Sequence, residues 1–199
     1  MSTKRPSHGE NPAILEIVKY GHPALRGKGR RIAKIDDTVR ILASDMLATM
    51  YDAEGVGLAA HQVGRTIRLA VIDVRPANDD RPSRAWQNGE EIDADDLMPL
   101  VMINPEIEPV GDERSLGGEG CLSMPGITDE VDRPARVRVT CTDLEGETVT
   151  FEAEGLLARA VQHEGDHLEG ILFIDHLSPQ DRAHHEPKLR KFLPTGGLF

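Results

Sequence analysis

Hydrophobic residues between positions 37 and 53 recur at the spacing of an amphipathic helix. The apolar positions on that face are Val39, Leu42, Ala43, Met46 and Met50. Asp36 or Asp37 can cap the start, and Gly55 lies just beyond the end, as is usual at helix termini. The pattern predicts an α-helix from Asp37 to Ala53.

Apolar and β-branched runs of strand length follow this helix. Residues 67–74 (IRLAVIDV) and 100–103 are two such runs, and Asn104-Pro105 is expected to stop the second. Residues 76–98, between the two runs, are polar, acidic and rich in turn formers. We therefore expect this segment to be a surface insertion rather than a domain boundary.

Strict alternation of apolar and polar residues marks a later pair of segments, 136–142 and 148–153. The turn-forming residues 143–146 (DLEG) separate them, which predicts a β-hairpin. Cys141 shares the inward face with two valines, so we expect a buried thiol without chemistry.

Residues 155–169 form the last strongly periodic segment, with Gly170 behind it. Its stripe on one face consists of Leu156, Ala160, His163 and His167. We predict a helix here. Together the elements predict an α+β fold in which antiparallel or mixed sheets pack around this central helix.

The chain has 199 residues, enough for one substantial core, so we expect a single domain over residues 1–199. Residues 1–12 contain basic residues but no apolar run, which indicates a disordered leader. Residues 178–199 form a charged C-terminal tail, in which Pro187 would break or kink any helix.

Composition narrows the class of protein. Hydrophobic residues make up 39% and charged residues 29%, and no apolar run approaches the roughly 20 residues of a membrane span. Without a secretory signal, the protein is expected in the cytoplasm. The net charge of −11 disfavours nucleic-acid binding, which needs a basic face. In a reducing compartment we expect no disulfide between Cys121 and Cys141.

The sequence His163-Glu164-Gly165-Asp166-His167 is a His-Glu-x-x-His motif on the predicted helix. Four residues advance a helix by about one turn and 6 Å, so both imidazoles face one way and can bind one ion. Glu164 can reach beside that ion toward a bound water, which is the position of a proton shuttle.

A catalytic metal usually has a third protein ligand and one open position. The third histidine found in one group of metalloproteases is absent, because its position holds Phe173. Glu186 and His176 remain downstream alternatives. The better candidate is Cys121, because the glycines of its segment, 117–126, let the backbone approach an ion and aim a thiolate.

Three segments together resemble the signature motifs of bacterial peptide deformylases, in the order of that family. They are GVGLAAHQ at 55–62, EGCLS at 119–123 and QHEGDHLEG at 162–170. The resemblance extends over roughly residues 14–175. It implies a metal-dependent hydrolase that removes the formyl group from the formyl-methionine of new polypeptides and releases formate.

The resemblance also implies the metal and its ligands, Cys121, His163 and His167. The family's native ion is typically Fe²⁺. Ni²⁺ or Co²⁺ should substitute well, whereas Zn²⁺ can bind in purified protein but should support activity poorly. A thiolate with two imidazoles suits such borderline ions.

In the mechanism implied by the resemblance, the metal lowers the pKa of a water and Glu164 accepts its proton. The hydroxide attacks the formyl carbon, and Glu164 then protonates the leaving amine. The Gln62 side chain and the Leu122 backbone N–H would stabilise the oxyanion, as the matching family positions do.

Substrate and supporting residues follow from the same resemblance. Val56 and Gly57 of the first motif, with Leu156 and Ala160 of the helix, would hold the methionine side chain and the peptide. Glu119 and Arg133 would form an ion pair beneath the cysteine segment. Thr128 stands where many relatives have a peptide-binding arginine, which leaves peptide preference after methionine open, and Arg159 receives no role.

Two other functional classes remain open at this point, a metallopeptidase that cuts internal bonds and a non-catalytic metal-binding protein. The expected substrate is the N-formyl-methionyl nascent peptide. Transient ribosome contact through Lys188, Arg190 and Lys191 is a further expectation, as is a monomeric state.

Overall fold

The computed structural model describes residues 12–77 and 82–193, so most of the predicted leader and the last six residues of the tail lie outside it. A seven-stranded sheet has the order β1-β2-β5-β8-β9-β3-β4, and β6 and β7 form a separate pair. The strands of the large sheet are β1 (Gly57–Ala59), β2 (Leu69–Ile72), β5 (Leu100–Pro109), β8 (Arg136–Thr142), β9 (Thr148–Glu154), β3 (Arg84–Gln87) and β4 (Glu90–Ile92). All pairings between these strands are antiparallel.

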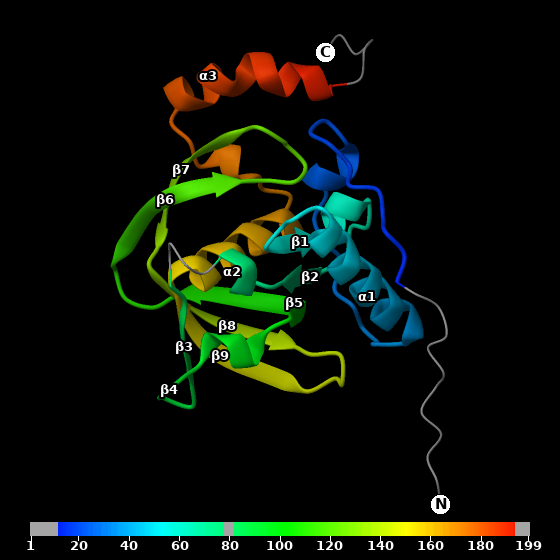
Figure 1. Cartoon of the computed structure of the whole chain (residues 1–199), viewed down its shortest axis with the longest axis vertical. Helices are drawn as coiled ribbons and strands as arrows, with labels where there is room; N and C mark the ends of the chain where they lie inside the picture. The colour runs from blue at the N-terminus through cyan, green and yellow to red at the C-terminus, as the bar shows by residue number, and fades with distance from the viewer. Residues whose placement is uncertain (1–11, 78–81, 194–199) are drawn as a thin grey trace, which may run out of the picture.

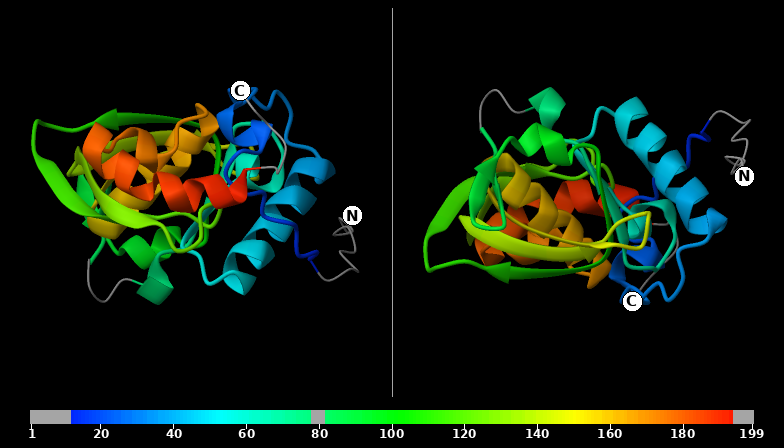
Figure 2. Two further views of the ribbon diagram at one scale, coloured as in Figure 1. Left: turned by 90° about the horizontal axis from the view of Figure 1, so that it is seen from above. Right: turned by 90° about the horizontal axis from the view of Figure 1, so that it is seen from below.

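Helix α2 (Gly155–Leu168) lies at the centre, between the large sheet and the pair β6 (Arg114–Gly120) and β7 (Thr128–Pro134) (Figure 1). The views from above and below (Figure 2) show α3 and the large sheet on opposite sides of α2. Antiparallel sheets around a central helix are the predicted α+β architecture, which is confirmed.

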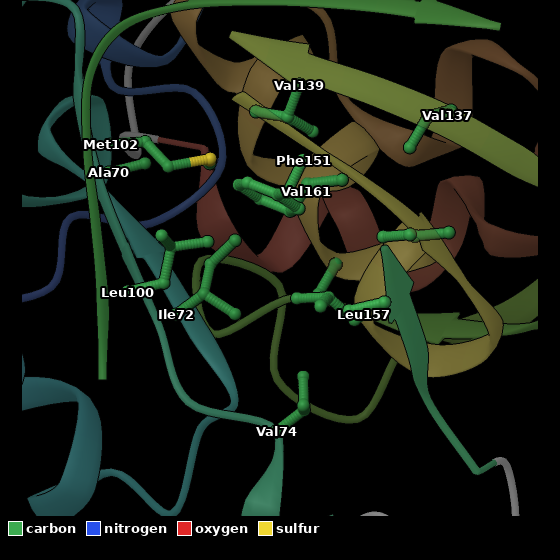
Figure 3. Packing of buried hydrophobic residues seen from close by; sticks show 14 of the residues in the cluster. Ala70, Ile72, Val74, Leu100, Met102, Val137, Val139, Phe151, Leu157 and Val161 are labelled. Carbon is green, nitrogen blue, oxygen red and sulfur yellow. The ribbon is translucent and has the colours of Figure 1, made fainter. Parts of the chain in front are cut away.

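The main core fills the space between α2 and the inner face of the sheet. Phe151 of β9 and Val161 of α2 are 1% and 0% exposed and face each other at its centre (Figure 3). Truncating such a buried phenylalanine to alanine costs about 3–5 kcal/mol. This packing fixes the position of the helix that carries the His-Glu-x-x-His motif.

The entry into α2 depends on Gly155. Its φ of 69° is left-handed, and a Cβ there would lie 2.2 Å from the carbonyl oxygen of Pro82. Only glycine meets both conditions without displacing the neighbouring chain. The predicted helix from 155 to 169 is confirmed to within one residue.

Helix α1 (Asp37–Asp52) confirms the first predicted helix. The Asp36 side chain accepts hydrogen bonds from the backbone N–H groups of Thr38 and Val39, as an N-cap should. The buried face of α1 packs on β1 and β2, and together they form a second hydrophobic cluster. This contact places the chain that leaves α1, residues 53–57, next to α2.

The predicted hairpin is present as β8 and β9, with Cys141 opposite Val149. Cys141 is 3% exposed, and burial raises the pKa of its thiol to about 12. A thiol held in its protonated form is a poor nucleophile and metal ligand. The expectation of an inert core cysteine is confirmed.

The expectation that Asn104-Pro105 stops a strand is wrong, because β5 continues to Pro109. The register against β8 shifts between Ile103 and Glu106, and Asn104 takes a left-handed φ of 51°. Its side chain forms two 2.8 Å hydrogen bonds with the backbone of Ile32. The irregularity absorbs the proline, which has no N–H to give to the ladder, and pairing resumes beyond it.

The expectation that Pro187 breaks or kinks a C-terminal helix is wrong as to the break, because α3 (Pro179–Leu189) runs through it. Pro187 lies in the last turn, so little helix follows the hydrogen bond that it removes. Helix α3 contacts the 126–129 segment, where Lys188 Nζ donates to the Gly126 carbonyl at 3.2 Å and His185 Nε2 lies 2.8 Å from Asp129. Within the described ranges, no helix has the length and apolar character of a bilayer span.

The segment predicted as a surface insertion contributes β3 and β4 to the edge of the large sheet. Ala85 pairs with Ala153 of β9 and is fully buried. Trp86 of this segment is half-buried, and the Arg136 guanidinium of β8 lies 3.7 Å from the centre of its ring. These residues lengthen the sheet away from the cavity described below.

Candidate metal centre

Helix α2 places His163 and His167 on one face, with their ring centroids 5.0 Å apart. His163 is 9% exposed and His167 is 1% exposed. The four-residue spacing brings the two side chains onto successive turns. Burial holds both rings in place, so a ligand pair is preorganised.

Cys121 follows the last residue of β6, so the first part of the glycine-rich segment 117–126, Gly117–Gly120, is strand. Ligand atoms of Cys121, His163 and His167 all lie within 4.8 Å of one another. Tetrahedral bonds of about 2.3 Å to sulfur and about 2.0 Å to nitrogen put neighbouring ligand atoms about 3.5 Å apart. Cys121 Sγ and His167 Nε2 are 3.4 Å apart, so the donor set fits a divalent ion.

Glu119 orients the first of these histidines. Its Oε2 lies 2.9 Å from His163 Nδ1. Two guanidinium groups hold the same carboxylate, Arg133 at 2.5 and 2.9 Å and Arg159 at 2.9 Å. With its proton on Nδ1, His163 presents Nε2 to an ion. The predicted pair of Glu119 and Arg133 is present, and both side chains are buried.

The charges and burial in this cluster shift the pKa values of the two histidines in opposite directions. Burial disfavours the charged form of His163, but hydrogen bonds with Cys121 and Glu119 outweigh it and raise its pKa well above the usual value. Burial and the charge at His163 lower the pKa of His167. Burial likewise opposes ionisation of Glu119, yet its hydrogen bonds from Arg133 and His163 hold the pKa of that carboxyl far below its usual range.

Glu164 is the candidate proton carrier and is 4% exposed. Burial raises the pKa of its carboxyl to about 7. Its Oε2 is buried and has no hydrogen-bond partner among the described residues. A carboxyl group whose pKa is near the ambient pH, and which has a free acceptor oxygen, can both accept and return a proton.

Gln62 lies in the turn after β1, and its orientation is fixed. Its Oε1 accepts a hydrogen bond from the Ala59 N–H at 2.8 Å, so its Nε2 faces Cys121 Sγ and Ser123 Oγ, each at 3.4 Å. The amide hydrogens therefore point to the metal centre. The other predicted oxyanion donor is the backbone N–H of Leu122, which follows Cys121 and lines the cavity described next.

A cavity of about 500 Å³ opens beside these groups. Its lining includes all four predicted substrate residues, Val56, Gly57, Leu156 and Ala160. Cys121, His163 and Glu164 also line it, so the candidate metal ligands and proton carrier face a largely apolar pocket. Thr128 lies on its exposed wall.

Arg159, which has no role predicted from the sequence, lies inside this assembly. Arg159 is 5% exposed and donates to Glu119 and to the backbone carbonyls of Val131 and Ser115. It thereby joins α2 to both β6 and β7. A charged residue one step from the apolar stripe of α2 was the available signal, but its partners lie 28 to 44 residues away.

The alternative third ligands lie elsewhere. His176 Nε2 is 2.7 Å from Asp166 Oδ2, and Glu186 pairs with Arg190 on α3. Among residues 12–77 and 82–193, the one group of three or more candidate ligands is that of Cys121, His163 and His167.

Comparison with known proteins places this site in context. Residues 14–183 match the family Polypeptide deformylase. A peptide deformylase from Acinetobacter baumannii (strain SDF) is 41% identical over 181 residues, 91% of this chain and 93% of the relative. One from Phenylobacterium zucineum (strain HLK1) is 44% identical over 179 residues, 90% of this chain and 96% of the relative. A solved peptide deformylase from Ehrlichia chaffeensis, in complex with actinonin, has a TM-score of 0.79 at 36% identity and covers 92% of this chain and 99% of its own.

Proposed function

The chain belongs to the polypeptide deformylase family, and from this premise we propose how its own residues carry out the reaction. The enzyme is a metal-dependent hydrolase that removes the N-terminal formyl group from formyl-methionyl nascent polypeptides. The products are formate and a free amino terminus. The observation that carries the assignment of residues is the convergence of Cys121, His163 and His167 beside buried Glu164.

Cys121, His163 and His167 would hold the ion, through one thiolate and two neutral imidazoles. A divalent ion bound there would act as a Lewis acid, which lowers the pKa of a water and polarises the formyl oxygen. Glu119 keeps the His163 ring in the required tautomer through the contact at Nδ1.

Glu164 moves the proton. Its unpartnered Oε2 accepts a proton from the attacking water as the oxygen bonds to the formyl carbon. The carboxyl then gives that proton to the amine nitrogen as the C–N bond of the formamide breaks. General acid–base catalysis of this kind contributes about 10²–10⁴-fold to rate.

Gln62 and Leu122 stabilise the charge that develops on the formyl oxygen. The hydrogen bond from Ala59 to Gln62 Oε1 prevents the side-chain amide from turning its oxygen toward that charge. Loss of one such donor typically costs about 3 kcal/mol in the barrier. Val56, Gly57, Leu156 and Ala160 bind the methionine and the adjoining backbone.

The test is formate release from a formyl-methionyl peptide, measured without oxygen on protein loaded with Fe²⁺ or Ni²⁺. We expect formate and an intact deformylated peptide in equal amounts. A metallopeptidase would instead fragment a longer peptide and leave its formyl group, and a non-catalytic metal protein would release neither. Either of these outcomes would overturn the assignment.

The finer properties are proposals of the same kind. We propose that the ion in the cell is Fe²⁺, with Ni²⁺, Co²⁺ or Zn²⁺ able to occupy the site in purified protein. Support comes from the mixed sulfur and nitrogen donors, which suit borderline ions. Metal analysis of anaerobically purified protein, alongside activity after reconstitution with each ion, tests this proposal.

Location and assembly follow from the substrate. We propose that the chain acts in the cytoplasm as a single-domain monomer, on peptides leaving the ribosome, with transient ribosome contact through Lys188, Arg190 and Lys191. Size determination in solution and co-sedimentation with ribosomes test these points. We also propose that actinonin, present in the Ehrlichia chaffeensis structure, binds the cavity of this chain and competes with formyl peptide.

A further inference from the structure

Two exposed, charged side chains line the cavity within the described part of the chain, Lys19 and Glu54. The charged groups deeper inside, such as Glu119 and Arg159, are buried and paired with each other. The exposed lining residues of segment 125–128, Pro125, Gly126 and Thr128, are uncharged. A peptide leaving the cavity therefore meets one exposed positive charge, at Lys19, and one exposed negative charge, at Glu54.

The backbone on both sides of Lys19 is fixed to the two segments that carry the proposed oxyanion donors. Val18 N–H donates to the Gln62 carbonyl at 2.8 Å, and Tyr20 N–H donates to the Ser123 carbonyl at 2.9 Å. The N-terminal segment thus lies against the catalytic loops, although more than 100 residues separate Tyr20 from Ser123 in the sequence.

The Lys19 side chain is held as well. Its Nζ donates to the Leu122 carbonyl at 3.0 Å. An ammonium group has three donors, so two remain for other partners. Leu122 is the neighbour of the metal ligand Cys121, so the charge lies close to the reacting end of the peptide. An extended peptide advances about 3.3 Å per residue, which puts its first residues after methionine within reach.

From these contacts we propose that Lys19 determines substrate specificity. Its ammonium binds an acidic side chain in one of the first three residues after the formyl-methionine and repels a basic one. This inference rests on the proposed deformylase function and adds to it a class of preferred substrate, formyl-Met peptides that are acidic near their start. Glu54 lies on a different segment, just beyond the end of α1, and is left unchanged in the test.

The experiment compares formyl-Met tetrapeptide amides that carry Asp, Asn or Lys at the second, third or fourth position, with Ala elsewhere. Amidation leaves the varied side chain as the only charge on the substrate. We expect the metal-loaded enzyme to favour Asp over Lys at one position by about fivefold in kcat/KM, the scale of an exposed ion pair. Asn should fall between the two.

Variants of Lys19 test whether this preference depends on its charge. Lys19→Met keeps the length without the charge and should bring the Asp-to-Lys ratio close to one, and Lys19→Glu should invert it. Lys19→Arg should retain it. The matched control is Lys28→Met, which removes one positive charge at a site 79% exposed that does not line the cavity, and its ratio should equal that of the unaltered enzyme.

The outcomes distinguish a failure of the deformylase assignment from a failure of the proposed role of Lys19. Absence of turnover on the Asn peptides would refute the deformylase assignment itself. Normal turnover with equal rates for Asp and Lys at all three positions would refute the role of Lys19 alone. So would a preference that survives unchanged in Lys19→Glu, provided that circular dichroism and metal content show an intact variant.

Discussion

Gly57 and Glu164 approach so closely that one methyl group should disable the proton carrier. A Cβ built on Gly57 would lie 2.3 Å from Glu164 Oε1, 2.9 Å from its Cδ and 3.0 Å from its Cγ. Ordinary van der Waals contact begins near 3.4 Å, so the carboxylate must shift by about 1 Å. Gly57 does not have a positive φ, so alanine brings no backbone strain and its effect is on Glu164.

We therefore expect Gly57→Ala to fold and to retain one metal ion, because none of the three ligands is touched. Its kcat should fall by about 10²-fold, which is the effect of a 1 Å misplacement of a reacting group. That loss corresponds to about 2.7 kcal/mol in the barrier. Formate release under saturating peptide measures kcat, and metal analysis checks the site.

The matched control is Gly165→Ala, also beside Glu164 but with its Cβ directed at the flexible end of Ile107, 2.6 Å away. A helical alanine there is favoured over glycine by about 1 kcal/mol, which helps to offset the crowding. We expect its kcat to stay within a few-fold of the unaltered enzyme. A Gly57→Ala enzyme with normal kcat, or with its whole defect in KM, would contradict the steric argument.

Three further predictions concern the metal centre. Glu164→Gln should lower kcat by about 10³-fold with unchanged metal content, and full activity of the variant would refute the proton-transfer role. In the unaltered enzyme, kcat/KM should fall as the pH drops below the pKa of Glu164. Burial raises that pKa to about 7, and a nearby cation lowers it. Cys121→Ser should lose its ion on dialysis against a chelator while the fold persists, and unchanged metal content would remove Cys121 from the ligand set. Glu119→Gln should lose about 3–5 kcal/mol of unfolding free energy in urea at pH 7, because the buried Arg159 guanidinium loses its carboxylate partner and buried Arg133 is left with Asp166 alone. The Glu119 pKa is depressed in the folded state, so the unaltered protein should lose this contribution as pH falls below the ordinary value of 4.5, and equal pH dependence in both proteins would contradict the assignment.

The parts of the structure that sequence reasoning predicted are those specified by local pattern. Helices α1 and α2 and the β8–β9 hairpin follow from periodicities of 3.6 and 2 residues, which depend on near neighbours. The two histidines follow for the same reason, because a spacing of four fixes their geometry within one helix. Periodicity alone did not identify Cys121 as a candidate ligand, and the glycines around it supplied the signal.

The parts that escaped prediction depend on contacts between distant segments. β5 continues past Pro105 because Asn104 bonds to Ile32, and Ala85 is buried because β3 finds β9. Neither partner can be identified from the residues alone. Lys19 is the extreme case, since it reaches a carbonyl 103 residues further along the chain. Tertiary context overrides the local preference at each of these positions.

The charges buried around α2 explain why one glutamate has two arginines. With the thiol and carboxyls ionised, the negative groups are Cys121, Glu119, Glu164 and Asp166, whose Oδ2 lies 2.8 Å from Arg133 Nη1, and the positive groups are Arg133 and Arg159. Both histidines are neutral when they bind a metal. The excess of two negative charges is offset by a divalent cation, so the cluster is balanced when the site is filled. Without Arg159 an uncompensated charge would remain in a poorly solvated region, where it costs several kcal/mol. The proposed roles of Cys121 as a thiolate ligand and of Glu164 as a proton carrier therefore account for the second arginine.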